Sequence, residues 1–438
     1  MCRKVSKFVA QCRLSEREKV WYHHTAGHRG REMNAMQNQF YVDYVEKSLA
    51  KKLAPGVVYS DREFEELVEG CVAELAEKIT IDENVAKKLT NEIFCAHRKL
   101  GILQPLLDDP DVNEIMINGT DSIFLERGGR MERYSERFSD AGMLFNVIQS
   151  MVSWVNRTVN ESSPIVDARL SDGSRVNVVL KPVALNGPIV TVRKFPDKVF
   201  TMRELEEGGS ISEEEALFLK QCVEARVNIF VSGGTASGKT TFLNVLCGFV
   251  PEEERIVTVE DSAELRLSPP NIVRLETRAA GPGGNGEISM RTLIKTSLRM
   301  RPDRIIVGEV RDMAALDMLQ AMCTGHDGSM STAHANSAAD AVTRIETMSL
   351  WEGNINSEAV RKQIASGLDL IVHMARDSSL KRSVEEICAT CGMENGNVKL
   401  CTVFKNGVKT NPVTKEMRIY EKLKKLGYTE TFNAEEAS

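Results

Sequence analysis

The stretch GGTASGKTT at residues 233–241 decides the fold of this chain. It contains the complete pattern G-x-x-x-x-G-K-[ST], and it lies between an apolar stretch at 228–232 and a helix-forming stretch at 240–248. In that setting the glycines let successive backbone N–H groups curl around phosphate oxygens, and the helix N-terminus adds partial positive charge. The sequence therefore predicts a loop that binds the phosphates of ATP. The predicted binding residues are Gly233, Gly234, Thr235, Ala236, Ser237, Gly238, Lys239, Thr240 and Thr241.

Two side chains of this loop carry specific predictions. Lys239 is expected to reach the β- and γ-phosphates, and the hydroxyl of Thr240 is expected to ligate Mg²⁺. The alternative, a chance glycine-rich turn, does not account for a complete motif placed between a strand and a helix. ATP and Mg²⁺ are therefore the expected ligands of this region.

The segments after the loop alternate between strand and helix patterns. Such alternation predicts an α/β domain in which a mostly parallel sheet is covered by helices on both faces. The expected strands are 228–232, 255–259, 304–307 and 329–333, and the expected helices are 240–248, 290–300, 312–324 and 338–348.

Upstream of the loop the pattern changes twice. From about residue 38 to 100, apolar residues recur at helical spacing, which predicts a small helical bundle. Beyond Asp109-Pro110, short strands, a helix at 144–155 and a hairpin around Asp172-Gly173 predict an α+β domain. The predicted division is 1–36, a basic and flexible arm; 37–104, the helical bundle; 105–200, the α+β domain; 201–420, the nucleotide-binding domain; and 421–438, a C-terminal tail.

Two acidic residues follow predicted strands of the nucleotide-binding domain. Glu309 ends an apolar run, which places its carboxylate at the edge of the sheet where ligands bind. Gly308 stands where an Asp is usual, so Glu309 is expected to act on Mg²⁺, through water. Glu260 is favoured as the base that activates the attacking water, although the acids beside it also suit a helix cap. The choice of base between Glu260 and Glu309 stays open at this stage.

Histidine and arginine side chains complete the predicted site. His326 and His334 bracket a strand in glycine-rich loops and are expected to hydrogen-bond the γ-phosphate and report its loss. The alternative for each is a histidine satisfied within the core. A guanidinium group suits the charge that builds on a transferring phosphoryl group, and surface salt bridges are the alternative. The arginines concerned are Arg169, Arg175 and Arg193 in the preceding domain, and Arg299, Arg301, Arg304 and Arg311 near the second acidic strand.

Composition excludes several classes of protein. The chain has 438 residues and a net charge of −6, so no global basic field favours nucleic acid as its partner. No apolar run reaches the ~18–20 residues that cross a bilayer, and no signal-peptide pattern is present. The sequence thus predicts a cytoplasmic protein with at most a peripheral membrane role. Its ten cysteines are expected to be reduced thiols, and Cys388, Cys391 and Cys401 lack the fourth ligand of a structural zinc site.

The order of four motifs is similar to that of one family. GGTASGKTT, VEDSAEL, MRPDRIIVGEVRD and TGHDGSMSTAHANS follow one another as in the secretion ATPase superfamily of type II, type IV pilus and type IV secretion systems. Four further stretches make the chain resemble the Tad/Flp pilus assembly ATPase branch, of CpaF type, most closely. They are LLDDPDVNEIMINGTDSIFLERGGR, IVDARLSDGSRVN, RLETR and GLDLIVHMAR. The resemblance covers residues 38 to about 410.

This resemblance implies a fold, an assembly and a set of partners. The implied fold is a RecA-like P-loop motor domain behind an α+β, PAS-like N-terminal domain, and the implied assembly is a homo-hexameric ring. ATP would lie between the two domains, and the partners would be integral platform proteins of the cytoplasmic membrane, with no direct binding of nucleic acid. By resemblance, Glu260 belongs to the acidic box, Glu309 to the second nucleotide motif, His326 and His334 to the histidine box, and Arg169, Arg175 and Arg193 close onto phosphate.

The sequence also departs from the family pattern. Ala236 stands where a Gly is common in the phosphate-binding loop, and Ala333 precedes His334 where a larger residue or Gly is frequent. Neither change removes a side chain that contacts phosphate, so activity is expected to survive. The tetracysteine zinc element of the type II secretion branch is absent from the sequence, which argues against that branch.

These expectations combine into one functional hypothesis. The chain is expected to be a cytoplasmic ATPase, peripherally associated with the membrane, that powers assembly of a Tad/Flp pilus or related type II/IV secretion machinery. One alternative is a conjugation-type traffic ATPase of a type IV secretion system. Another is a regulatory module that binds nucleotide without sustained turnover, although the acidic and histidine motifs argue against it.

Overall fold

The architecture comes from a computed structural model in which the chain divides into two compact units, Met1–Phe195 and Pro196–Ser438. Each unit is described by itself. The finer division into an arm, a bundle, two domains and a tail stays a prediction. The structure describes residues 30–53, 61–79, 81–98, 100–153, 157–170, 172–195, 199–267, 269–278, 280, 286–351, 353 and 355–428.

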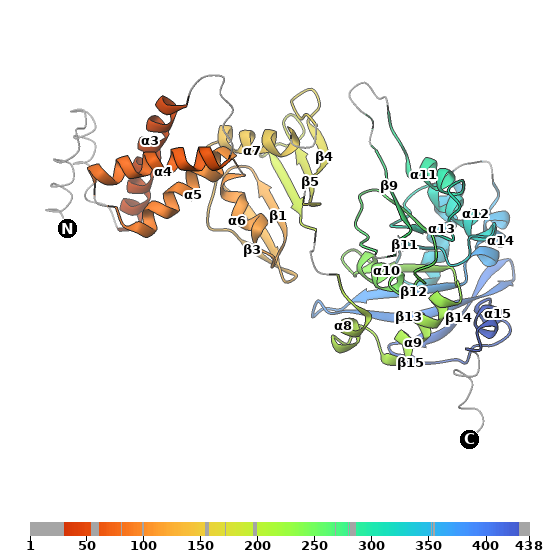
Figure 1. Cartoon of the computed structure of the whole chain (residues 1–438). Helices are drawn as coiled ribbons and strands as arrows, with labels where there is room; N and C mark the ends of the chain where they lie inside the picture. The colour runs from red at the N-terminus through yellow and green to blue at the C-terminus, as the bar shows by residue number, and fades with distance from the viewer. Residues whose placement is uncertain are drawn as a thin grey trace. The chain divides into compact units, whose positions relative to one another are not determined.

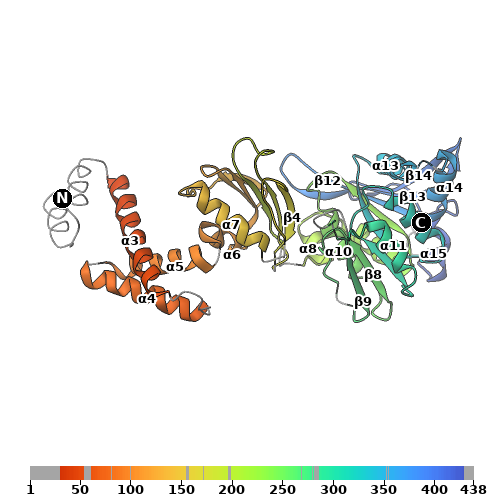
Figure 2. The same cartoon turned by 90° about the horizontal axis from the view of Figure 1, so that it is seen from above.

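In the first unit, the described residues begin with three helices. They are α3 (Gly30–Lys52), α4 (Asp61–Lys78) and α5 (Glu83–Arg98), which gather at the N-terminal end of the chain (Figures 1 and 2). Val45, Val68 and Ile93, one from each helix, are buried in their shared core, as the helical spacing of apolar residues predicted. Helix α3 begins inside the stretch predicted as a flexible arm, and residues 1–29 of that arm lie outside the described residues.

An antiparallel sheet follows in the first unit. Its strand order is β3-β2-β1-β6-β5-β4. Helix α7 (Ala141–Ser153) lies along one face (Figure 2), and Leu144, Ile148 and Met151 from that helix are fully buried against the sheet. The other elements are the short helices η1 (Gly101–Leu103) and α6 (Gln104–Asp108), and the strands β1 (Val112–Asn118), β2 (Ile123–Arg127), β3 (Arg130–Arg133), β4 (Ile165–Arg169), β5 (Arg175–Val179) and β6 (Ile189–Arg193).

The second unit is built on a larger sheet with the order β15-β14-β13-β12-β7-β11-β10-β8-β9. The strands from β12 to β9 run parallel, as the alternation of strands and helices predicted, and β13 to β15 extend the sheet antiparallel. The strands are β7 (Ile229–Gly233), β8 (Ile256–Glu260), β9 (Ile272–Glu276), β10 (Arg304–Val307), β11 (Met330–His334), β12 (Leu370–Arg376), β13 (Arg382–Glu394), β14 (Asn397–Lys405) and β15 (Val408–Lys409).

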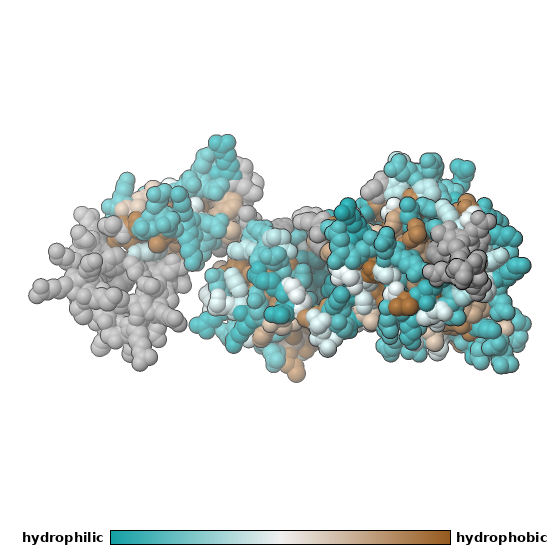
Figure 3. Space-filling model, turned by 90° about the horizontal axis from the view of Figure 1, so that it is seen from below, coloured by the Kyte–Doolittle hydropathy of each residue, from teal (hydrophilic) through white to brown (hydrophobic). Residues whose placement is uncertain are grey.

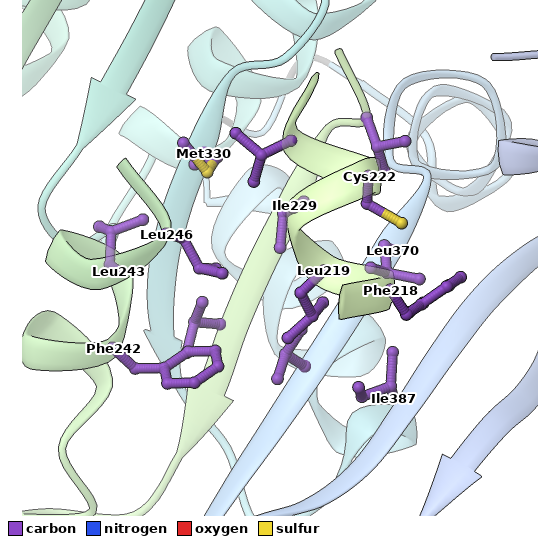
Figure 4. Close-up of a cluster of buried hydrophobic side chains, with 14 of the residues drawn as sticks. Phe218, Leu219, Cys222, Ile229, Phe242, Leu243, Leu246, Met330, Leu370 and Ile387 are labelled. Carbon is purple, nitrogen blue, oxygen red and sulfur yellow. The ribbon is translucent and has the colours of Figure 1, made fainter. Parts of the chain in front are cut away.

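Helices cover both faces of this sheet. Strand residues alternate between the faces, so neighbours such as Ile229 and Phe230 enter different cores. The core shared with α9 and α10 contains Phe218, Leu243 and Leu370 (Figure 4), and α11 to α14 pack on the other face. The helices are α8 (Met202–Glu207), α9 (Glu213–Glu224), α10 (Lys239–Cys247), α11 (Met290–Ser297), α12 (Ala314–Cys323), α13 (Ala338–Leu350), α14 (Ser357–Gly367) and α15 (Ile419–Lys425).

Two helices of the second unit, α9 and α15, show how its first and last parts join the core. Ser212 and Glu215 form a capping box that starts α9. At the other end, Leu423 of α15 is buried in the core shared with α9, although the stretch from 421 was predicted as a tail. The apolar face of α15 therefore belongs to the packed unit.

One pair of cysteines corrects a prediction. Cys391 and Cys401 form a disulfide, although the sequence was expected to hold reduced thiols throughout. Strands β13 and β14 pair antiparallel, with Ala389 facing Cys401 and a register shift between Thr390 and Met393, and Cys391 lies within that shift. Sequence spacing did not reveal this register. The third member of the group, Cys388, is free and buried on the same hairpin.

The surface is hydrophilic with scattered apolar residues (Figure 3). Large apolar side chains that stay exposed include Met131, Leu185, Trp351 and Val408, which lie on different elements. None of the described helices combines the length and apolar composition that a bilayer-spanning segment requires.

Candidate functional site

The loop at 233–241 connects β7 to α10 at the carboxyl edge of the parallel strands. Gly233 has to be a glycine, because a Cβ there would lie 2.4 Å from the backbone oxygen of Met374. Gly238 caps α10 with φ of 93°, which lies in the left-handed region that favours glycine. The predicted strand–loop–helix context is therefore confirmed, and the two glycines give the backbone its turn.

Ala236 lies within the phosphate-binding loop and has an unusual backbone conformation. Its φ is 58°, a left-handed value that costs a residue with a Cβ free energy relative to glycine. The backbone oxygen of Ala236 accepts a hydrogen bond from Nε of Arg382 at 3.0 Å. Arg382 is the first residue of β13. No sequence motif marks it as part of the site, because it lies far from the loop along the chain.

Lys239 lies at the start of α10 and is largely buried. Its Nζ donates to the backbone oxygen of Gly234 at 2.7 Å and lies 3.3 Å from Nδ1 of His334. His334 is the last residue of β11, directly beside Gly233 in the register of the sheet. The predicted loop lysine and one of the two predicted histidines are thus brought together.

Glu309 stands between His334 and an arginine. Its Oε1 lies 3.0 Å from Nε2 of His334, and its Oε2 accepts from Nε of Arg311 at 2.9 Å. A second nitrogen of Arg311 reaches the same oxygen at 2.5 Å. Of the arginines predicted near this strand, Arg311 is the one that pairs with Glu309. We call the run Lys239–His334–Glu309–Arg311 the polar relay.

Protonation of the polar relay follows from its neighbours. Burial, and then the positive charge of Lys239, hold the pKa of His334 below its ordinary value, so the ring is neutral at pH 7. A lysine ammonium only donates, so Nδ1 must accept and the proton of the neutral ring lies on Nε2. That N–H lies 3.0 Å from Oε1 of Glu309, a buried oxygen that accepts no hydrogen bond from the described residues.

Glu260 ends β8 and lies beside Gly308. Its Oε2 accepts from the backbone N–H groups of Glu264 at 2.7 Å and Leu265 at 3.0 Å. Its buried Oε1 has no hydrogen-bond partner among the residues that the structure describes. Burial raises the pKa of this carboxyl to about 7 even though the two N–H groups oppose the shift. Glu260 is therefore a buried carboxyl with one oxygen available.

Gly308 explains how two acids share this edge. A Cβ on Gly308 would lie 3.1 Å from Cγ of Glu260, which is tighter than ordinary contact. Strands β8 and β10 pair in parallel, with Val259 beside Val307, so the residues that follow these two meet directly. The glycine in place of the usual Asp therefore gives the Glu260 side chain its room.

His326 is placed away from this group. It precedes β11 on the amino side, whereas His334 ends the same strand on the carboxyl side. The amino side is marked by Asn228, whose side-chain oxygen accepts from the N–H groups of Gly328 and Ser329. Within one chain the structure does not bring His326 to the loop, and its role stays a prediction.

Arg304 of β10 serves packing. Arg304 is fully buried, and its Nε and one terminal nitrogen bind both oxygens of Glu254 at 2.6 and 3.1 Å. Its remaining terminal nitrogen donates to the backbone oxygen of Val223. Arg304 thus holds α9 and the turn before β8 to the amino edge of the sheet.

The three arginines of the first unit form a row. In the register of the sheet Arg169 faces Arg175, and Arg175 faces Arg193. Facing residues of antiparallel strands share one side of the sheet, and this side is opposite to the buried Val176 and Val192. Nε of Arg193 lies 3.8 Å from Glu114, and Nε of Arg169 donates to the backbone oxygen of Gly173. We call the three residues the arginine row.

These groups suit a magnesium–nucleotide complex. The glycine turn exposes backbone N–H groups, and the hydroxyl of Thr240 in the first turn of α10 and the carboxylate of Glu309 are oxygen donors of the kind Mg²⁺ prefers. The available Oε1 of Glu260 is a buried acceptor at the same edge. The donor set therefore fits a hard cation bound together with phosphates.

The sequence can now be set beside known proteins. Residues 96–430 match the family described as "Type II/IV secretion system protein". The chain belongs to this type II/IV secretion system family. The matched span contains the loop, both acids and the polar relay. Membership confirms the predicted secretion ATPase superfamily and the predicted enzyme class, an ATP hydrolase with a nucleotide substrate.

Two relatives illustrate this secretion family. The chain is 34% identical over 310 residues to a Mycobacterium tuberculosis protein named for a suggested role in conjugal transfer, covering 69% of this chain and 88% of the relative. It is 32% identical over 294 residues to the conjugal transfer protein TrbB of Rhizobium radiobacter, covering 66% of this chain and 87% of the relative.

A solved structure of the same superfamily supports the fold. The pilus retraction motor PilT with bound ADP shares 19% identity and a TM-score of 0.50, over 76% of this chain and 89% of that chain. At this identity the likeness concerns the fold alone. The RecA-like motor fold, preceded by a helical and β-sheet region, is therefore confirmed for this secretion ATPase.

Proposed function

We propose that this secretion ATPase is a motor that hydrolyses ATP with Mg²⁺ to drive assembly of a Tad/Flp pilus or related type II/IV secretion machinery. The observation that carries the proposal is the polar relay at the phosphate-binding loop, with Glu260 beside it. A loop that binds nucleotide as a switch has no need of a buried carboxyl with an available oxygen at the same edge of the sheet. The arrangement therefore favours turnover over a regulatory module.

The groups divide the work of hydrolysis between them. Lys239 and the loop N–H groups hold the β- and γ-phosphates. A role of Arg169, Arg175 and Arg193 on phosphate stays a prediction of the family resemblance. When bound, Mg²⁺ neutralises charge on the phosphate oxygens, and Thr240 and Glu309 are the residues that would hold it. Glu260 takes a proton from the water that attacks the γ-phosphorus, and the bond to the β-phosphate oxygen breaks to release ADP.

His334 links the lysine to the second acid. Its neutral ring accepts from Lys239 at Nδ1, and its Nε2 lies 3.0 Å from Oε1 of Glu309, so a change in the position of Lys239 on phosphate binding moves the ring against Glu309. We propose that His334 reports the presence of the γ-phosphate in this way. For His326 the same role requires a surface from another copy of the chain, and a homo-hexamer with integral platform proteins of the cytoplasmic membrane is the assembly that we propose.

The location and partners belong to the same proposal. We expect the motor to work at the cytoplasmic face of the membrane without direct binding of nucleic acid. The sequence stretches that resemble the Tad/Flp branch support pilus assembly as the process driven.

The deciding experiment replaces Lys239 with Ala in the full chain. Steady-state release of phosphate from ATP is expected to fall by at least ~100-fold, because the lysine contacts the phosphates that change charge in the transition state. Lys381→Ala, which removes a lysine from the neighbouring hairpin, serves as the matched control and is expected to hydrolyse ATP normally. Wild-type rates in Lys239→Ala would remove the nucleotide assignment.

A conjugation-type traffic ATPase is the second candidate. The relatives named for conjugal transfer favour it, since they align over most of their own length. Deletion of the gene separates the two candidates: loss of surface pili with normal plasmid transfer supports pilus assembly. Loss of plasmid transfer with normal pili supports conjugation.

A further inference from the structure

The hairpin between β12 and β13 forms one side of the phosphate-binding loop. Met374 of β12 lies beside Gly233 in the sheet, and β13 returns antiparallel with Arg382 facing Arg376. The other three members of the polar relay lie on the other side of β7 from β12, because His334 ends β11 while Glu309 and Arg311 follow β10. The loop is therefore held between two walls of different composition.

Arg382 lies against the phosphate-binding loop at Ala236 and Gly238. Its Nε donates to the backbone oxygen of Ala236 at 3.0 Å, and a Cβ on Gly238 would lie 3.3 Å from its Cδ. The arginine thus touches the loop on both sides of Ser237. These contacts fall on the segment whose N–H groups are expected to receive the phosphates.

The residue that Arg382 holds has an unfavourable backbone conformation. Ala236 has φ of 58° and stands where the family pattern commonly has glycine. A glycine adopts this conformation freely, whereas alanine resists it because its Cβ crowds the backbone. A hydrogen bond to the carbonyl oxygen of Ala236 fixes the orientation of its peptide group and so holds this turn.

We propose that Arg382 is a positioning residue that clamps Ala236 in its left-handed conformation and so keeps the loop ready for phosphate. This inference rests on the proposed function, since it concerns the binding of the same ATP. The clamp and the alanine compensate for each other: the chain tolerates alanine because the arginine holds it.

The clamp predicts a separation of binding from chemistry. In Arg382→Ala, the KM and Kd for ATP are expected to rise about tenfold, the size expected for loss of one hydrogen bond and relaxation of the loop, while kcat stays within about twofold. Isothermal titration with ATP and steady-state assays measure the two quantities. A fall in kcat with unchanged KM would overturn the clamp.

A double-variant cycle tests the compensation directly. In the Ala236→Gly background, Arg382→Ala is expected to change the KM for ATP by less than about twofold, because glycine takes the turn without help. Ala236→Gly in the Arg382→Ala background is expected to return KM to within about threefold of the wild-type value. If the double variant binds ATP as weakly as Arg382→Ala, Arg382 acts through its charge and the clamp is wrong.

Two further variants separate hydrogen bonding from charge and from folding. Arg376→Ala removes a positive charge from the facing register position without removing a contact to Ala236, so an equal loss of affinity there would overturn the clamp. Arg382→Lys keeps the charge and packing of the stem but loses Nε, and its KM is expected to rise severalfold with a wild-type thermal midpoint. Should Lys239→Ala still hydrolyse ATP, the proposed function fails; if the Arg382 series alone has no effect, only the clamp fails.

Discussion

Buried charged groups at the two edges of the nine-stranded sheet differ in how fully they are hydrogen-bonded. At the amino edge, the fully buried Asp369 receives hydrogen bonds from the N–H of Asn228, from Arg418 and from Lys422, and Arg304 binds both oxygens of Glu254. At the carboxyl edge, Glu260 is almost as deeply buried, but its Oε1 has no partner within the described residues. The hydrogen-bonded charges of Asp369 and Arg304 stabilise the fold, whereas Oε1 of Glu260 is available to a reacting group.

This difference predicts which substitutions should destabilise the fold and which should lower catalysis. Removing a group from the matched edge leaves another buried charge without its partner, which destabilises the folded state. Removing the available oxygen at the other edge deletes no intramolecular hydrogen bond, so the fold should tolerate it while catalysis should not. Burial by itself does not distinguish the two edges, since Asp369 and Glu260 are both buried.

The largest expected effect comes from Glu260→Gln. Hydrolysis is expected to fall by about 10²–10⁴-fold because an amide cannot accept the proton of the attacking water, while ATP still binds. Phosphate release and ATP titration measure the two properties. Glu309→Gln is the matched variant and is expected to weaken the dependence on Mg²⁺; if it abolishes hydrolysis and Glu260→Gln does not, the two roles are reversed.

The next effect concerns the matched edge. Asp369→Ala is expected to lower the free energy of unfolding by about 3–5 kcal/mol, because Arg418 and Lys422 then lose a buried partner. Denaturant titration of the full chain measures it. Asp327→Ala removes a half-exposed partner of the same Lys422 and is expected to cost less than about 1 kcal/mol. Equal losses from both variants would contradict the contrast between the edges.

The pH dependence of hydrolysis sharpens the contrast further. Because burial raises the pKa of Glu260 to about 7, this carboxyl is still protonated below that pH and cannot act as a base. The value of kcat/KM should therefore rise with pH, about tenfold per pH unit below 7, and level off above it. A profile that is flat between pH 5.5 and 8.5 would show that the rate does not depend on this ionisation. Glu260→Gln should lack the rise.

The smallest effect comes from Gly308→Ala. The added methyl group would press on Cγ of Glu260, so hydrolysis is expected to fall severalfold through displacement of the carboxyl, with little change in ATP affinity. Gly70→Ala adds the same group to α4, where a Cβ meets only the far end of the Lys52 side chain, and is expected to leave hydrolysis unchanged. A normal rate in Gly308→Ala would show that the edge has more room than the contact implies.

Local patterns predicted the parts of the site that lie close together along the chain. The loop, its flanking strand and helix, and the acids at the ends of β8 and β10 follow from motif spacing and apolar runs. These elements were predictable because a strand–loop–helix unit satisfies its own hydrogen bonds and buries its own apolar face. The family membership that the four motifs suggested is likewise confirmed.

Contacts between distant strands could not be predicted in the same way. Strand β12 pairs with β7 across more than a hundred residues, and this pairing alone brings Arg382 to Ala236. The facing of Arg169, Arg175 and Arg193 and the disulfide of Cys391 depend on antiparallel register, which turn and bulge geometry sets. The assignment of His326 to the same site relied on its closeness to His334 in sequence, yet a strand separates the two.

The room that Gly308 leaves for Glu260 has a consequence for how such sequences can change. A side chain at 308 and a long acid at 260 compete for one volume, so the two positions should vary together among relatives. Lineages that acquire a larger residue at 308 are expected to carry a shorter acid, such as aspartate, at 260. Either change alone lowers activity, so the path between the two states crosses a less fit intermediate. Gly308 after β10 and Glu260 at the end of β8 are therefore expected to change together during evolution.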